Sequence, residues 1–139
     1  MKRRPRPRGN MGAFAFSAAL EASSAEKSSM QIAYVNVFVT DLKRAVAFYE
    51  STLELQLVRA DEEHGYASFA AGSVQLGLAV PGPDQAELVG RHTGVGFSVT
   101  DLEVEHARLS QEGVVSSMPP TRQPWGGFMA LLADPDGNV

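Results

Sequence analysis

Three histidines offer the most versatile chemistry in this chain, but none has partners at the spacing of a recognisable site. His64 ends the acidic run that begins at Asp61, and His106 falls on the outer side of a helical pattern, so we expect both to be solvated. His92 follows Arg91 at the end of a Pro/Gly-containing stretch and is expected in an exposed loop. The sequence has no cysteine, which excludes disulfides, thiolate metal sites and cysteine nucleophiles.

Acidic and hydroxyl side chains give no clearer catalytic set. Glu62 and Glu63 fall on an expected turn, and Glu103 and Glu105 on a helix surface, where solvation explains them better than acid–base work. Ser98 has no evident His and Asp partners, and the chain lacks a nucleophile elbow, a phosphate loop and a dinucleotide-binding glycine pattern. The catalytic residues, if there are any, are therefore unknown from the sequence.

The composition indicates one soluble globular body. The chain has 139 residues, of which 44% are hydrophobic and 20% charged, and no apolar run approaches the roughly 18 residues of a membrane helix. Residues 1–29 carry six cations and two anions, whereas the remainder has a net charge of −8. Because an acidic body repels phosphate backbones, we expect no nucleic acid and no membrane among its partners. The absence of cysteine fits a cytoplasmic protein.

Residues 1–29 form a distinct leader. A Pro/Arg cluster, MKRRPRPRGN, is followed by an Ala/Ser-rich stretch without a period that would bury one face, so we expect disorder. The order of charge and apolar residues faintly resembles a targeting peptide, but an upstream translation start or an expression remnant explains it better. The folded domain is expected from residue 30 to residue 139.

The first half of this domain reads as strand, helix and three strands. Residues 32–39 are β-branched or aromatic almost throughout, as in a strand. Thr40 or Asp41 can cap a helix over residues 42–53, whose apolar residues follow helical spacing. Shorter strands are expected over residues 57–60, 66–71 and 74–80, so module one spans residues 31–80, and a linker covers residues 81–92.

The pattern then restarts, which signals an internal repeat. Residues recur at an offset of 60: Val35, Val39, Thr40, Asp41, Leu42 and Ala47 are matched by Val95, Val99, Thr100, Asp101, Leu102 and Ala107. A second helix is expected over residues 102–112, closed by Gly113, with strands near residues 114–118 and 127–133. Module two thus spans residues 93–139, and the fold class is α+β with two βαβββ modules.

Three separated motifs carry a family resemblance. They are the TDL sequence after the first strand of each module, PWGG at residues 124–127, and DPDGN at residues 134–138. Over residues 31–139 the chain resembles the vicinal oxygen chelate superfamily, which contains glyoxalase I, extradiol dioxygenases and bleomycin-resistance proteins. The resemblance implies two half-barrel sheets around a ligand cavity, with helices outside. Against that fold we expect the last strand to be truncated, because only two residues follow DPDG in the sequence.

The resemblance and the two-residue period of a strand together assign side chains to faces. Those expected to pack under the helices are Val35, Val37, Val39, Val95, Phe97 and Val99. Those expected to face the cavity are Tyr34, Asn36 and Phe38 from module one and Gly94, Gly96 and Ser98 from module two. One wall of the cavity is therefore bulky and the other nearly bare, which suits an organic ligand but also suits close strand packing.

The same resemblance implies a test for metal binding. Metal-dependent members carry ligands at the positions of Tyr34 and Gly94, and a third ligand near Gly77, where Gln75 lies on the same face. Glycine offers no donor and tyrosine is an uncommon ligand for these ions, so we expect no metal and no cofactor. A fourth ligand would lie beyond Val139, and a two-residue slip would be needed to turn His92 inward.

We therefore expect a homodimeric, metal-free protein that binds an apolar or aromatic small molecule, as the resemblance to bleomycin-resistance proteins implies. The residues expected to line its site are Tyr34, Asn36, Phe38, Gln75, Ser98, Trp125 and Phe128. Trp125 could equally plug the barrel mouth or a dimer contact. The alternatives are a divergent metal-dependent lyase, isomerase or dioxygenase, and a structural dimer whose cavity has collapsed.

Overall fold

A four-stranded sheet forms most of module one. The computed structural model describes residues 29–139, so the disorder expected for residues 1–29 falls, apart from residue 29, outside the described residues. The strands are β1 (Tyr34–Phe38), β2 (Gln56–Asp61), β3 (Tyr66–Ala71) and β4 (Val74–Ala79), in the order β1-β4-β3-β2. β1 runs parallel to β4, and the other neighbours are antiparallel. All four strands were expected from the sequence.

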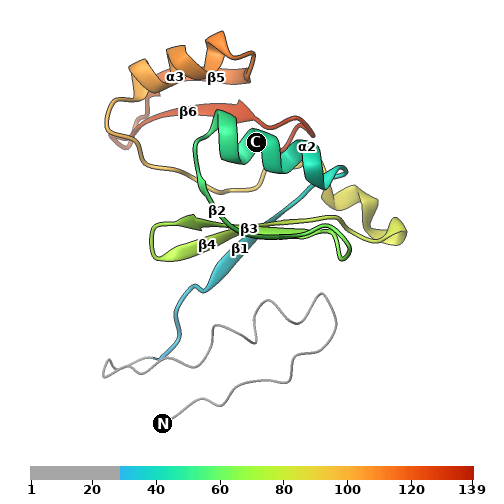
Figure 1. Cartoon of the computed structure of the whole chain (residues 1–139). Helices are drawn as coiled ribbons and strands as arrows, with labels where there is room; N and C mark the ends of the chain where they lie inside the picture. The colour runs from blue at the N-terminus through green and yellow to red at the C-terminus, as the bar shows by residue number, and fades with distance from the viewer. Residues whose placement is uncertain (1–28) are drawn as a thin grey trace.

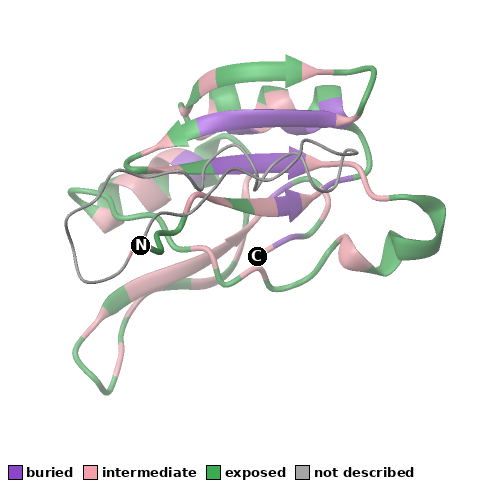
Figure 2. Cartoon of the chain, turned by 90° about the horizontal axis from the view of Figure 1, so that it is seen from below, coloured by how far each residue is buried: buried purple, intermediate pink, exposed green. Residues whose placement is uncertain are grey.

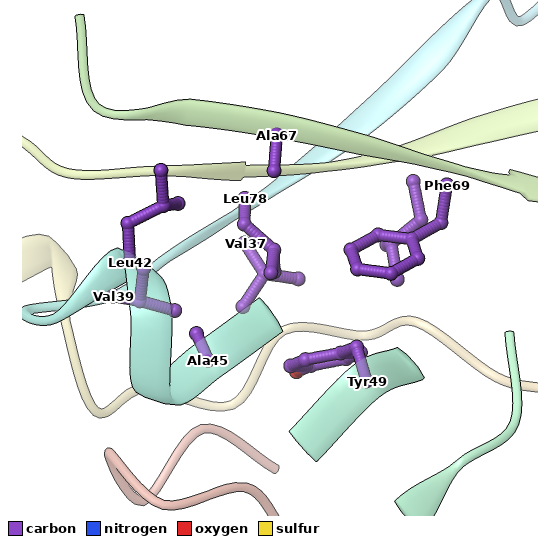
Figure 3. Packing of buried hydrophobic residues seen from close by; sticks show 9 residues of the cluster. Val37, Val39, Leu42, Ala45, Tyr49, Ala67, Phe69 and Leu78 are labelled. Carbon is purple, nitrogen blue, oxygen red and sulfur yellow. The ribbon is translucent and has the colours of Figure 1, made fainter. Parts of the chain in front are cut away.

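One face of this sheet is covered by α2 (Leu42–Ala47), which continues as the π-helical turn η1 (Phe48–Thr52). Asp41 caps α2 by accepting a hydrogen bond from the Arg44 amide, as the sequence predicted. Figure 3 shows the resulting core, in which side chains of the sheet meet those of the helix. Its buried members are Val37, Val39, Leu42, Ala45, Tyr49, Ala67, Phe69, Leu76 and Leu78. The buried residues lie mainly in this sheet (Figure 2).

Module two consists of α3 (Leu102–Gln111) and the hairpin of β5 (Val115–Arg122) and β6 (Phe128–Ala133). A short 3₁₀ segment, η2 (Pro83–Leu88), lies in the linker. Asp101 caps α3 as Asp41 caps α2, and Gly113 has the expected left-handed conformation, with φ of +88°. Module two lies on the α2 side of the sheet, so the opposite face of the sheet points away from it (Figure 1).

The opening strand of module two, which the repeat implies around Val95 and Val99, is not formed, and this part of the prediction is wrong. Its first residues start a parallel ladder, because Val139 donates a backbone hydrogen bond to Arg91 O and accepts one from Thr93 N. In module one the equivalent ladder runs along all of β1 and β4, whereas only Val139 occupies that place beside residues 93–99 in the described chain. Phe97 and Val99, expected to be packed, are consequently 47% and 44% exposed. Val35, on an edge strand, is also exposed.

The DPDGN turn does more than reverse the chain, because it ties the end of module two to module one. Thr40 Oγ1 donates a 2.6 Å hydrogen bond to Asp136 Oδ1, and Asn138 Nδ2 donates to the carbonyl of Phe38 at 2.9 Å. The hydroxyl of Tyr49 donates to Asp134 Oδ2 at 2.9 Å, and both side chains are buried. We call these residues, 134–138 with their partners, the clasp. The sequence reasoning recognised its turn but not these contacts.

The clasp makes a testable contribution to stability at high pH. Burial, followed by the nearby Asp134 carboxylate, raises the pKa of Tyr49 far above its ordinary value. Above about pH 10 an unfolded chain loses this proton while the folded chain keeps it, so folding stability must fall as pH rises. Tyr49→Phe keeps the aromatic ring but removes the hydroxyl group, and with it the ionisable proton and the hydrogen bond to Asp134. We expect the variant to lose about 1.5–3 kcal/mol at neutral pH.

The measurement is urea unfolding of both proteins between pH 7 and pH 11. The slope of stability against pH above pH 10 should be shallower for Tyr49→Phe, by up to about 1.4 kcal/mol per pH unit, which corresponds to one proton. Parallel slopes for the two proteins would show that Tyr49 ionises equally easily in both states.

Candidate functional site: the open face of the first sheet

The open face is the side of the four-stranded sheet opposite α2. Because side chains alternate along a strand, Val37, Leu76 and Phe69 point into the core and their neighbours point outward. β1 contributes Tyr34, Asn36 and Phe38 to this face, β4 contributes Gln75 and Gly77, and β3 contributes Tyr66 and Ser68. The open face is thus aromatic and uncharged at its centre.

The strand register brings four of the predicted site residues together. Tyr34 pairs with Gln75, Asn36 pairs with Gly77, and Phe38 follows on the same side of β1. Ser68, which pairs with Gly77 and is 2% exposed, was not singled out from the sequence. The alternation in YASFA would have placed it on the same face as Tyr66.

Asn36 and Tyr66 fill the space above Gly77. A methyl group added at Gly77 would overlap Asn36 Oδ1 and lie 2.7 Å from the Tyr66 hydroxyl oxygen. Gly77 is therefore required by this close approach. Among the described residues, Asn36 Oδ1 is buried and accepts no hydrogen bond. A buried carbonyl without a donor costs free energy, so Asn36 is the least satisfied group of this face.

The two tyrosines of the open face are neutral hydrogen-bonding groups at ordinary pH. Burial raises the pKa of Tyr34. Burial also raises the pKa of Tyr66, with a further increase from Tyr34 and an opposing effect from Arg59. Arg59 lies at the rim, 3.7 Å from the Asp61 carboxylate. The site therefore presents neutral phenols and amides, with a charged pair only at its edge.

The donor set does not fit a divalent metal ion. The register places Gln75, rather than Gly77, directly opposite Tyr34, so the pair at this position is a phenol and an amide. Gly94 supplies no side-chain donor, and a methyl group added there would meet nothing within 4 Å. Within residues 29–139 no three His, Cys, Asp or Glu side chains form a group that could hold a metal ion.

The three histidines serve other contacts or none. His64 Nδ1 lies 2.9 Å from Asp61 Oδ2, at the β2–β3 turn, and His92 is exposed. His106 was expected to be solvated, and this is wrong: it is partly buried, and its Nε2 lies 2.9 Å from Ser116 Oγ. Ser116 sits at a register shift of β5, so this hydrogen bond satisfies an irregular part of the hairpin.

The remaining predicted site residues lie elsewhere. Ser98 and Phe128 line a cavity of about 660 Å³ between the two modules, on the α2 side of the sheet. Trp125 belongs to the β5–β6 turn and is 74% exposed. One chain therefore does not bring these three residues to Tyr34 and Asn36.

The cavity lies where module two would hold the counterpart of β4. Its long sides are residues 95–99 and β6, and the equivalent place in module one, between β1 and β3, is occupied by β4. A strand edge that borders such a space carries backbone N–H and C=O groups, which another strand satisfies better than an organic molecule does. We therefore locate the candidate site on the open face and not in this cavity.

Comparisons with known proteins agree with this architecture. TnmS3, an antibiotic-binding protein from Streptomyces sp. CB03234, is 28% identical, with a TM-score of 0.66 over 79% of this chain and 91% of its own. A superfamily member from Sphaerobacter thermophilus is 25% identical, with a TM-score of 0.64 over 78% and 92%. A lactoylglutathione lyase from Agrobacterium tumefaciens, at 24% identity and a TM-score of 0.60 over 78% and 88%, shares the fold. No curated protein matches the chain.

The family model matches almost all of the described chain. It covers residues 31–139, from the start of β1 through the clasp, and so includes both modules of the repeat. The chain belongs to the glyoxalase/bleomycin resistance protein/dioxygenase superfamily.

Proposed function

We propose that the chain binds an uncharged, partly aromatic small molecule on the open face, without a metal ion and without chemical turnover. The observation that carries this proposal is the pairing of Tyr34 with Gln75 and of Asn36 with Gly77, which places aromatic and amide groups, and no charged side chain, at the centre of the face. Such surfaces bind organic molecules by stacking and by a few hydrogen bonds. The similarity to an antibiotic-binding protein supports the proposal.

A second copy of the chain completes the site in this proposal. The open face points away from module two of the same chain, while Trp125 and Phe128 stay 74% and 39% exposed. Exposed aromatic side chains beside other apolar residues favour an interface. A two-fold dimer that sets module two of one copy on the open face of the other would bring Ser98, Trp125 and Phe128 toward Tyr34.

The proposal includes a location for the protein in the cell. Within residues 29–139 no helix is long and apolar enough to cross a membrane. A cytoplasmic location remains part of the proposal, since a chain without cysteine suits a reducing compartment.

Ligand binding can be tested with neutral bicyclic aromatics, such as indole and 2-naphthol, in a thermal-shift assay. A compound that binds only the folded state raises the melting temperature, by an amount equivalent to about 2.7 kcal/mol at 100 times its Kd. Phe38→Ala should weaken binding at least fivefold, because it removes a ring from the open face. Lys43→Ala, on the exposed side of α2, is the control and should bind normally.

Sedimentation velocity on the same samples should give a dimer. A monomer at micromolar concentration, or the absence of any thermal shift across the panel, would contradict the proposal.

Metal content separates this proposal from a metal-dependent lyase, isomerase or dioxygenase. Protein purified without chelator should contain less than about 0.1 equivalent of Ni, Zn, Fe or Mn, and added metal should not raise its melting temperature. Elemental analysis by mass spectrometry makes this measurement. One equivalent of bound metal, removed together with stability by a chelator, would favour the enzyme.

Gly77→Ala tests the close packing of the open face. The added methyl group would overlap Asn36 and crowd Tyr66, so we expect a loss of about 1–3 kcal/mol in unfolding free energy and weaker aromatic binding. Gly96→Ala is the matched control for the unfolding measurement alone, because nothing lies within 4 Å of its added methyl group and its φ is not in the left-handed region. Equal stability of the two variants would argue against this packing.

A further inference from the structure

We propose that Asn36 determines ligand specificity at the open face, by selecting molecules that donate a hydrogen bond. The inference rests on the proposed function and names the chemistry of its ligand. It starts from Asn36 Oδ1, which is buried and accepts no hydrogen bond from residues 29–139. It is the only side-chain oxygen or nitrogen in that part of the chain with both properties.

The surroundings of Asn36 explain why the sheet itself provides no donor. The residue across the ladder is Gly77, which has no side chain, and the next strand presents Ser68 at the same level. The backbone N–H groups of β1 and β4 are directed along the sheet and hold the strands together. Within residues 29–139 no group donates to this carbonyl, so a donor supplied by a ligand would approach from above the sheet.

The carboxamide can present its carbonyl to that side. Asn36 as a whole is only partly buried, so part of its amide reaches the surface. Turning the amide about its last torsion exchanges oxygen and nitrogen, and places the N–H₂ group over Gly77 near the Tyr66 hydroxyl oxygen. A phenol oxygen can accept from an amide, so this orientation leaves the carbonyl at the surface. Both orientations occupy the same space, because the amide oxygen and nitrogen are nearly equal in size.

The selectivity for ligands then depends on which group replaces the water bound to the Asn36 carbonyl. In the free protein a surface carbonyl is hydrated, and a bound ligand excludes that water. A ligand with an N–H or O–H group restores the hydrogen bond, whereas its methylated analogue leaves the carbonyl unpaired. Sites of this kind reject the analogue that lacks the donor, and we expect at least a tenfold difference in Kd. The carboxylate at the rim does not compete, since Asp61 already contacts His64 and Arg59.

The test uses two pairs of probes that differ only in the donor: indole with 1-methylindole, and phenol with anisole. Dissociation constants are measured on the full chain by ¹H–¹⁵N NMR, following the backbone amide resonances of β1 and β4, which are present in every variant. In the wild-type protein indole and phenol should bind at least tenfold tighter than their methylated analogues. Asn36→Leu should abolish the difference, and Asn36→Asp, which still accepts a hydrogen bond, should retain it.

Controls separate specificity from folding and from binding itself. Gln85→Leu removes an exposed amide from η2 and should leave the preference unchanged. If Asn36→Leu does not fold, Asn36→Ala takes its place. Equal affinities within each pair for the wild-type protein, or a preference that survives Asn36→Leu, overturn the inference while small-molecule binding stands. If none of the four probes shifts the resonances of the open face, the proposed function fails and the inference fails with it.

Discussion

The parallel pairing of β1 with β4 is the constraint on which the rest of the structure depends. It fixes Val37 beside Leu78 on the α2 side and Asn36 beside Gly77 on the other. A slip of one residue would exchange the two faces, burying amides under the helix and exposing the core. The same ladder therefore determines both the core and the candidate site. Selection for a well-packed core keeps this register, and with it the position of the site residues.

Much of this arrangement could be predicted from the sequence, because it depends on local periodicity. The alternation in residues 34–39 predicted which β1 side chains face the open side, and the repeat at an offset of 60 predicted the two capped helices. The exposure of Phe97 and Val99 could not be predicted in this way. Alternation says which side a residue faces if a strand forms, but strand formation depends on the neighbour that supplies hydrogen bonds.

Contacts between segments far apart in the sequence also could not be predicted from periodicity. The DPDGN turn was recognised from its Pro, Asp and Gly, yet its Asp136 reaches Thr40 across 96 residues, and Asn138 reaches the β1 carbonyl of Phe38. The orphan carbonyl of Asn36 is likewise a property of the assembled sheet. It arises because Gly77 and Tyr66 arrive from two other strands.

The difference between the modules bears on how a binding site could be assembled. Module one has a complete sheet with a polar and aromatic face, whereas module two offers small residues at 94, 96 and 98 and exposed aromatic side chains at its hairpin. A surface rich in fixed side chains and a surface that is nearly bare are complementary, since a flat ligand can lie between them without displacing either. Two bare surfaces would not fix the orientation of a ligand, and two surfaces covered with large side chains would leave no room for it. The unequal repeat therefore favours a site made from two different halves. Module two packs on the α2 side of its own sheet, so in the proposed dimer the second half comes from another copy.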